Sequence, residues 1–136
     1  MWSEDDIVEG LVLHLDPDVL EKSGGSYNVS KEIRVKGGHF FLCVQAGDDD
    51  GEWMPLFSSP SKDRVVIPFE GRTGDMKWVK GAAHLHPGQT WKAKHAAILL
   101  AAKAGKDISG PSSPRTLSPW VFRSLLSGNN PKDGQH

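Results

Sequence analysis

Short apolar stretches separated by turn-forming residues recur along much of the chain, a pattern typical of a β-rich protein. The most continuous stretch, "GHFFLCVQA" (38–46), predicts a central strand that is buried on both faces. The turn "GDDDG" then leads into "EWMPLF" (52–57), which predicts a hairpin with Trp53 and Met54 on opposite faces. An earlier strand is predicted by "GLVLHL" (10–15), because the Asp-Pro-Asp that follows it is a turn signal.

Less regular stretches predict further strands at "EIRVK" (32–36), "DRVVIPF" (63–69) and "MKWVKGAAHLH" (76–86). Pro68 has no backbone N–H and therefore places the end of the second of these strands at a sheet edge. The Gly- and Ser-rich "EKSGGSYNVSK" (21–31) is typical of a loop.

Two segments toward the C-terminus have helical character. "HAAILLAAKAGK" (95–106) is rich in alanine and leucine and ends at a glycine, although "TWKAKHA" before it alternates like a strand. We expect a helix here from about Lys92 to Ala104. "SPWVFRSLLSG" predicts the last helix over residues 118–127, with Ser118 as its N-cap.

The 136 residues are enough for one ordinary hydrophobic core and too few for two. We therefore expect residues 1–128 to form one mainly β (α+β) domain, a small barrel with helical attachments, and residues 129–136 to form a flexible tail. The single Cys43, inside the predicted central strand, is expected to serve in packing. No stretch approaches the roughly 20 apolar residues of a spanning helix, and the acidic N-terminus is unlike a secretory signal. A cytoplasmic protein without a membrane segment is expected.

Charge is unevenly distributed, although the net charge is only -1. Residues 1–21 carry acidic side chains and no lysine or arginine, whereas residues 77–106 carry lysines and no acidic residue. Tryptophans interleave with these lysines, and bases stack on indole rings while ammonium groups bind phosphates. In a plain amphipathic strand, such tryptophans would instead face the core. The candidate RNA-binding residues of this segment are Trp78, Lys80, Trp91, Lys92 and Lys94.

Three stretches of the chain resemble the PemK/MazF family of toxins: "GLVLHLDPD", "EWMPLFSSPSK" and the closing "TLSPWVFRSLL". The resemblance implies an SH3-like β-barrel with a C-terminal helix and one further helix, a homodimer, and an antitoxin-like protein partner. It also implies metal-independent cleavage of single-stranded RNA, with Ser58 or Ser59 as the hydroxyl residue at the scissile phosphate.

The chain departs from this family where the family has an arginine before the central strand, because His39 stands there in "GGHFFLCV". RNA cleavage needs a proton acceptor, a proton donor and a cation. An imidazole suits proton transfer near neutral pH, and Lys36 or Arg34 would supply positive charge. The candidate catalytic residues are therefore His39, Ser58 and Ser59, while the plainer alternative for His39 is a packed or solvated histidine.

Two histidines in "HLHPG" (84–88) are similar to the first metal motif of cupins, in which both bind one divalent ion. The glutamate that completes that motif is missing from positions 89–93, and Lys92 and Lys94 would repel a cation. No metal and no cofactor are expected.

The predicted function is that of a toxin-like or toxin-derived RNA-interacting protein, with metal-independent endoribonuclease activity as its enzymatic form. The alternative is a non-catalytic β-barrel module that recognises a protein or peptide through exposed aromatic residues such as Trp53 or Trp120. A cupin-like metal protein is the third hypothesis.

The metal hypothesis is tested by elemental analysis of the purified protein. We expect no stoichiometric zinc, iron or manganese, because the motif lacks its acidic ligand. About one metal ion per chain, lost on replacing both His84 and His86, would favour the cupin-like hypothesis instead.

Overall fold

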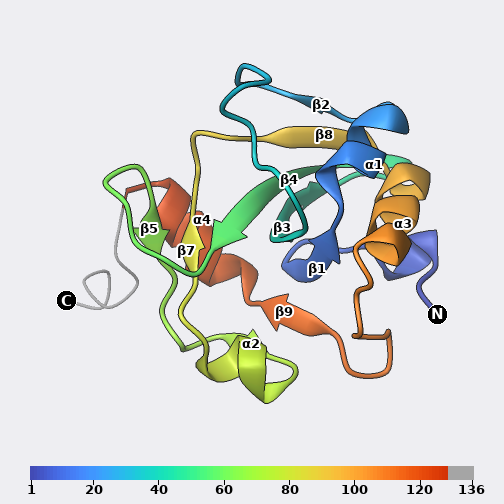
Figure 1. Ribbon diagram of the computed structural model, residues 1–136. Helices are drawn as coiled ribbons and strands as arrows, with labels where there is room; N and C mark the ends of the chain where they lie inside the picture. The colour runs from blue at the N-terminus through green and yellow to red at the C-terminus, as the bar shows by residue number, and fades with distance from the viewer. Residues whose placement is uncertain (129–136) are drawn as a thin grey trace.

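The computed structural model describes residues 1–128, and the tail expected over residues 129–136 lies outside the described residues. Short strands and helices alternate along this part of the chain (Figure 1). The strands are β1 (Leu11–Leu15), β2 (Ser26–Tyr27), β3 (His39–Ala46), β4 (Asp50–Phe57), β5 (Val65–Val66), β6 (Arg72–Thr73), β7 (His84–Leu85), β8 (Trp91–Lys94) and β9 (Arg115–Leu117). The helices are the 3₁₀-helix η1 (Glu4–Asp6) and α1 (Pro17–Lys22), α2 (Met76–Lys80), α3 (His95–Ala104) and α4 (Pro119–Leu126).

All strand pairs among residues 1–128 are antiparallel. The main path of the sheet runs β2-β8-β4-β3-β1-β9-β6, and β7 pairs with both β4 and β5 beside it. The outermost strands of this path, β2 and β6, do not pair with each other, so the sheet is open and not closed into the expected barrel. Helices cover both faces of the sheet, which therefore does not need to curl onto itself to bury its apolar side chains.

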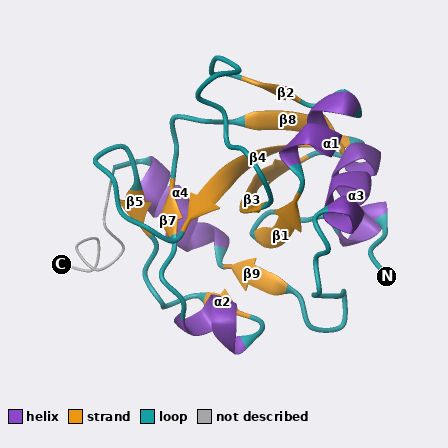
Figure 2. Ribbon diagram, viewed as in Figure 1, coloured by secondary structure: helices purple, strands orange, loops and turns teal. Residues whose placement is uncertain are grey.

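The β3–β4 hairpin divides the interior into two cores, as its sequence predicts. Phe41, Cys43 and Trp53 belong to the core beneath α1 and α3. Leu42 and Met54 point to the other face and belong to the core beneath α2 and α4. Figure 2 shows α1 and α3 side by side at one end of the sheet and α4 at the other. The predictions of a buried central strand and of opposite faces for Trp53 and Met54 are confirmed.

Cys43 lies at the centre of this hairpin and has no exposed surface. Burial raises the pKa of its thiol to about 12, because the low-polarity core disfavours the thiolate. The predicted packing role of this residue is confirmed.

The strand predicted over residues 10–15 is confirmed as β1, but the Asp-Pro-Asp after it begins a helix and not a turn. The Asp16 carboxylate caps α1 by accepting hydrogen bonds from the backbone N–H groups of Asp18 and Val19. The proline at the first helical position needs no such partner.

The helix expected from about Lys92 begins instead at His95, after strand β8. Side chains of β8 alternate between buried and exposed, so the strand pattern of "TWKAKHA" is correct as far as Lys94. The closing helix is confirmed as α4, preceded by Ser118. Ser118 is the N-cap residue, as predicted, but its hydroxyl donates to the carbonyl of Gly71 and makes no hydrogen bond with the helix.

The strand predicted over residues 76–86 is wrong for its first half, which forms helix α2. The side chain of Asp75 accepts from the backbone N–H of Trp78 and caps this helix, and only His84–Leu85 form a strand. Within residues 63–69 the strand is limited to β5, two residues long.

Residues 32–36 form no strand, because Arg34 holds this segment against α1. The buried Arg34 side chain makes ion pairs with Asp18 at 2.6 Å and Glu21 at 3.0 Å. Among residues 1–128, no helix has both the length and the apolar character needed to cross a membrane.

Arg72 fixes the long connection between β5 and β7. Its guanidinium is buried and donates to the carbonyl oxygens of Pro68 (3.1 Å), Ile67 (2.7 Å), Trp78 (2.8 Å) and Gly81 (2.6 Å). These carbonyls have no partner in a regular strand pair, so a single cation satisfies four backbone acceptors.

Replacing this cation tests its importance. We expect Arg72→Met to lower the free energy of unfolding by about 3 kcal/mol or more, because several buried carbonyls lose their donor. The matched control is Arg123→Met, which removes an exposed ion pair with Glu9 and should cost less than about 1 kcal/mol. Urea denaturation of both variants measures the difference, and equal losses would contradict this role of Arg72.

Candidate functional site

A pocket of about 310 Å³ opens where β3 begins and β4 ends. Its walls come from the segment after β2, from the two strand ends, and from the loops that flank β5 and β7. Apolar, cationic, acidic and imidazole side chains meet in it. The residues that line it are Glu32, Ile33, Arg34, Val35, Lys36, His39, Phe57, Ser61, Asp63, Arg64, His86 and Gln89.

Phe57 is the residue around which the reactive groups of this pocket gather. The imidazole of His39 lies edge-on to its ring, with 4.9 Å between ring centroids, and that of His86 does so at 6.1 Å. The guanidinium carbon of Arg64 lies 3.8 Å from the centroid of the same ring. Two histidines that are far apart in sequence are thus brought to one aromatic side chain, next to a cation.

His39 is held by the hairpin that forms the core. Its Nδ1 lies 3.3 Å from the carbonyl oxygen of Leu56, and since a carbonyl can only accept, Nδ1 carries the proton in the neutral ring. The lone pair of that ring is then on Nε2. Burial lowers the pKa of His39, although hydrogen bonds to the backbone of Leu56 and Lys36 act the other way.

His86 is held by the same kind of contact. Its Nδ1 donates to the carbonyl of Asp63 at 3.1 Å, and its backbone N–H donates to the carbonyl of Pro55 on β4. His84, two residues earlier, is buried on β7 and lines a different pocket. The structure therefore separates the two histidines of the cupin-like motif, which do not face one common site.

Positive charge at the pocket comes from Arg64 and Lys36. One terminal nitrogen of Arg64 donates to the carbonyl (2.9 Å) and the hydroxyl (3.1 Å) of Ser59, and the Arg64 side chain lines the pocket. Arg34 also lines the pocket, but its ion pairs with α1 already occupy it. Neither of the predicted catalytic serines, Ser58 and Ser59, is among the residues that line the pocket, and Ser59 is linked to it only through its hydrogen bonds with Arg64.

The predicted base-stacking tryptophans are both buried. Trp91 has no exposed surface and Trp78 is 5% exposed, and their indole N–H groups donate to Gln89 and Thr116 within the protein. Neither ring offers a face to a nucleotide. The alternative hypothesis from the sequence, that these tryptophans face the core, is confirmed for both.

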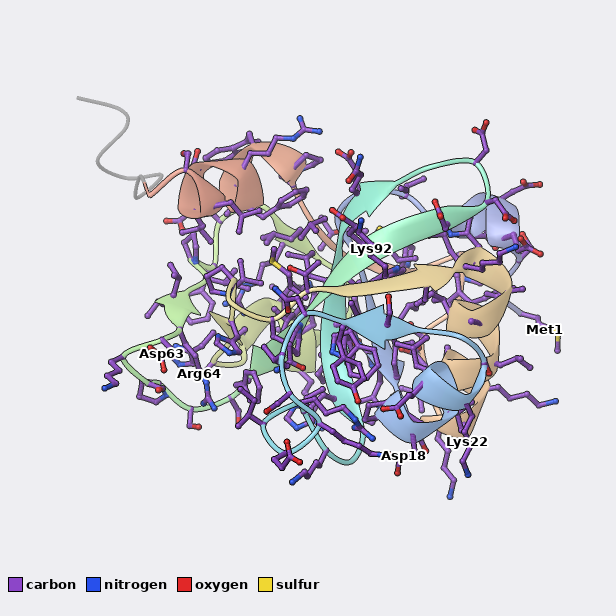
Figure 3. The ribbon with its side chains drawn as sticks, turned by 90° about the horizontal axis from the view of Figure 1, so that it is seen from above. Met1, Asp18, Lys22, Asp63, Arg64 and Lys92 are labelled. Atoms are coloured by element: carbon purple, nitrogen blue, oxygen red, sulfur yellow. The ribbon has the colours of Figure 1, made fainter. Side chains whose placement is uncertain are left out.

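The predicted RNA-binding lysines of the segment 77–106 lie away from the pocket. Lys92 and Lys94 are exposed on β8, where they pair with Glu52 at 3.4 Å and Asp49 at 3.5 Å, and Lys80 lies on α2. Figure 3 shows Arg64 well separated from Lys92. Lys36 is the predicted substrate-binding residue that the fold brings next to His39.

The aromatic residues proposed for protein recognition also differ in exposure. Trp53 is completely buried and is not available to a partner, whereas Trp120 on α4 is 51% exposed.

Sequence reasoning missed most residues of the pocket, among them Phe57, Arg64, His86 and Gln89. His86 was considered only as a metal ligand, because nothing in "HLHPG" indicates that the fold brings it close to His39. No pattern in the sequence distinguishes Arg64 from other surface arginines or Gln89 from other loop residues.

No protein-family model, curated protein or solved structure matches this chain. The proposed function therefore rests on the pocket alone.

The state of His39 is open to direct measurement. We expect its imidazole to titrate below the ordinary value of 6.5, because burial beside Phe57 disfavours the charged ring. As pH falls through that ordinary value, the unfolded chain takes up a proton that the folded chain does not, so His39 lowers stability in acid. NMR titration measures this pKa, and Phe57→Ala should move it back toward 6.5. A pKa above 6.5 in the unmodified protein would contradict the assignment.

Proposed function

We propose that this protein binds single-stranded RNA in the pocket around Phe57 and cleaves it without a metal ion. The observation that carries the proposal is the placement of His39 and His86 around one aromatic ring, with the Arg64 guanidinium over that ring. A pair of imidazoles and a cation are the groups that RNA cleavage needs.

The proposed reaction is attack of the ribose 2′-oxygen on the adjacent phosphorus. His39, whose pKa burial lowers, accepts the 2′-hydroxyl proton on Nε2 as the new O–P bond forms. His86, in its protonated form, gives a proton to the 5′-oxygen as the P–O bond to that oxygen breaks. The products are a 2′,3′-cyclic phosphate and a 5′-hydroxyl, and water restores the proton states of the two rings.

Arg64 and Lys36 would neutralise the charge that grows on the phosphate oxygens in the transition state. Arg64 is suited to this role because Ser59 fixes one of its nitrogens and Phe57 supports its plane. The serine that the toxin resemblance places at the scissile phosphate thus acts here through an arginine. That arginine comes from the loop before β5 and not from the strand entrance where the family has it.

The resemblance to PemK/MazF toxins adds a cytoplasmic homodimer and an antitoxin-like partner to the proposal. Because the described sheet is open, support for the proposal comes from the pocket and not from an SH3-like barrel. The exposed Trp120 favours a second candidate function, a non-catalytic module that recognises a protein partner through α4.

The test is cleavage of a fluorescently labelled single-stranded RNA in the presence of EDTA. We expect His39→Ala and His86→Ala each to lower the cleavage rate by about 100-fold or more, the usual contribution of one general acid or base. Lys103→Met, an exposed change on α3, serves as the control and should leave the rate unchanged. The same sequence made as DNA should not be cut, since it lacks the 2′-hydroxyl.

A second measurement separates the pocket from the lysines of β8. RNA affinity should fall as salt rises, and Arg64→Met should reduce the slope of that dependence by about one counterion. If Lys92→Met and Lys94→Met reduce the slope instead, RNA runs along β8 as the sequence predicts. A protein that neither binds nor cuts RNA at low salt would leave the protein-recognition module as the function.

A further inference from the structure

Gln89 lies in the wall of the pocket with its side chain almost fully enclosed, at 2% exposure. Its Oε1 accepts two hydrogen bonds, from the backbone N–H of Val35 at 3.0 Å and from the indole N–H of Trp91 at 2.8 Å. Both partners can only donate, so the orientation of the carboxamide is fixed by chemistry. The oxygen faces the protein.

The other end of the carboxamide, Nε2, carries two N–H groups. Within residues 1–128 it has no hydrogen-bond partner, and Gln89 is one of the residues that line the pocket. Nε2 is not one of the fully buried side-chain atoms that lack a partner, so its N–H groups reach the pocket, where a ligand or water can accept from them. At Gln89 the pocket therefore offers a bound molecule donors and no acceptor.

The surroundings of this donor suit a nucleobase. Ile33, Val35 and Phe57 give the pocket apolar walls, while the cationic groups Arg64 and Lys36 mark where a phosphate would lie. A ribonucleotide with its phosphate at the cations would direct its base toward the apolar walls and the amide of Gln89.

We infer, on the basis of the proposed RNA-binding function, that Gln89 is a specificity-determining residue that selects bases carrying a keto oxygen at the edge facing it. The 4-oxygen of uracil and the 6-oxygen of guanine accept hydrogen bonds, whereas the amino groups at the same positions of cytosine and adenine donate. A donor facing a donor leaves both unsatisfied. Uracil and guanine are therefore favoured over cytosine and adenine.

Titration of the full-length protein with the four ribonucleoside 3′-monophosphates, followed by NMR, tests the inference. We expect uridine and guanosine monophosphates to bind about tenfold more tightly than their cytidine and adenosine counterparts. Gln89→Glu keeps an oxygen for Val35 and Trp91 but replaces the donor by an acceptor. This variant should reverse the preference, toward cytidine and adenosine monophosphates, even if the added negative charge weakens all four.

Ile33→Ala is the matched control, because Ile33 lines the same pocket and is 67% exposed, so its loss leaves the core intact. It should weaken all four nucleotides without changing their order. Equal affinities in the unmodified protein, or the same order in Gln89→Glu as in the unmodified protein, would overturn the inference. So would the absence of binding at millimolar nucleotide.

The two proposals fail in different ways. Binding with the expected preference but no cleavage of RNA would sink the catalytic roles of His39 and His86 and support that of Gln89. Cleavage without any preference between bases would support the catalytic roles of His39 and His86 and contradict the role of Gln89. If Gln89→Glu does not fold, as judged by its thermal transition, the preference of the unmodified protein alone decides the question.

Discussion

Burial of the β3–β4 hairpin on both faces is the constraint on which the rest of the structure depends. Alternate side chains of β3 enter separate cores, so a slip of one residue would exchange Phe41 with Leu42 and disrupt both. The register that prevents this also sets the pocket. His39 begins β3 and Phe57 ends β4, so antiparallel pairing places them at the same end of the hairpin. The position of the candidate site therefore follows from the same strand register that directs alternate side chains of β3 into the two cores.

Buried arginines hold the loops in place, as apolar side chains hold the β3–β4 hairpin. Arg34 ties the segment after β2 to α1 and lies over the rings of Tyr27 and Trp91, while Arg72 holds the connection from β5 to β7. Arg115 pairs with Asp75 and Asp107 beneath the ring of Phe40. These guanidiniums allow long irregular segments to keep fixed positions, because each one satisfies several acceptors at once.

The sequence predicted what depends on local apolar pattern and not what depends on a distant partner. Residues 38–46 were predictable as a strand because they form a continuous apolar run. Residues 118–127 were predictable as a helix because a Ser-Pro pair marks the start of a helix. The segment 32–36 was wrongly predicted as a strand from its alternating apolar and charged residues. One of these charged residues, Arg34, instead forms an ion pair with Asp18 of α1, a distant partner that the local pattern does not show. Likewise, His39 was found as a proton-transfer candidate, but its partner His86 meets it only through the pairing of β4 with β7.

The position of Cys43 has a practical consequence for following this molecule in solution. The only thiol of the chain is enclosed at the junction of the hairpin with the α1–α3 core, and with a pKa of about 12 it is protonated at neutral pH. A thiol reagent reaches it only when that core opens. The rate of its chemical labelling therefore reports opening of the innermost part of the fold, without any engineered probe.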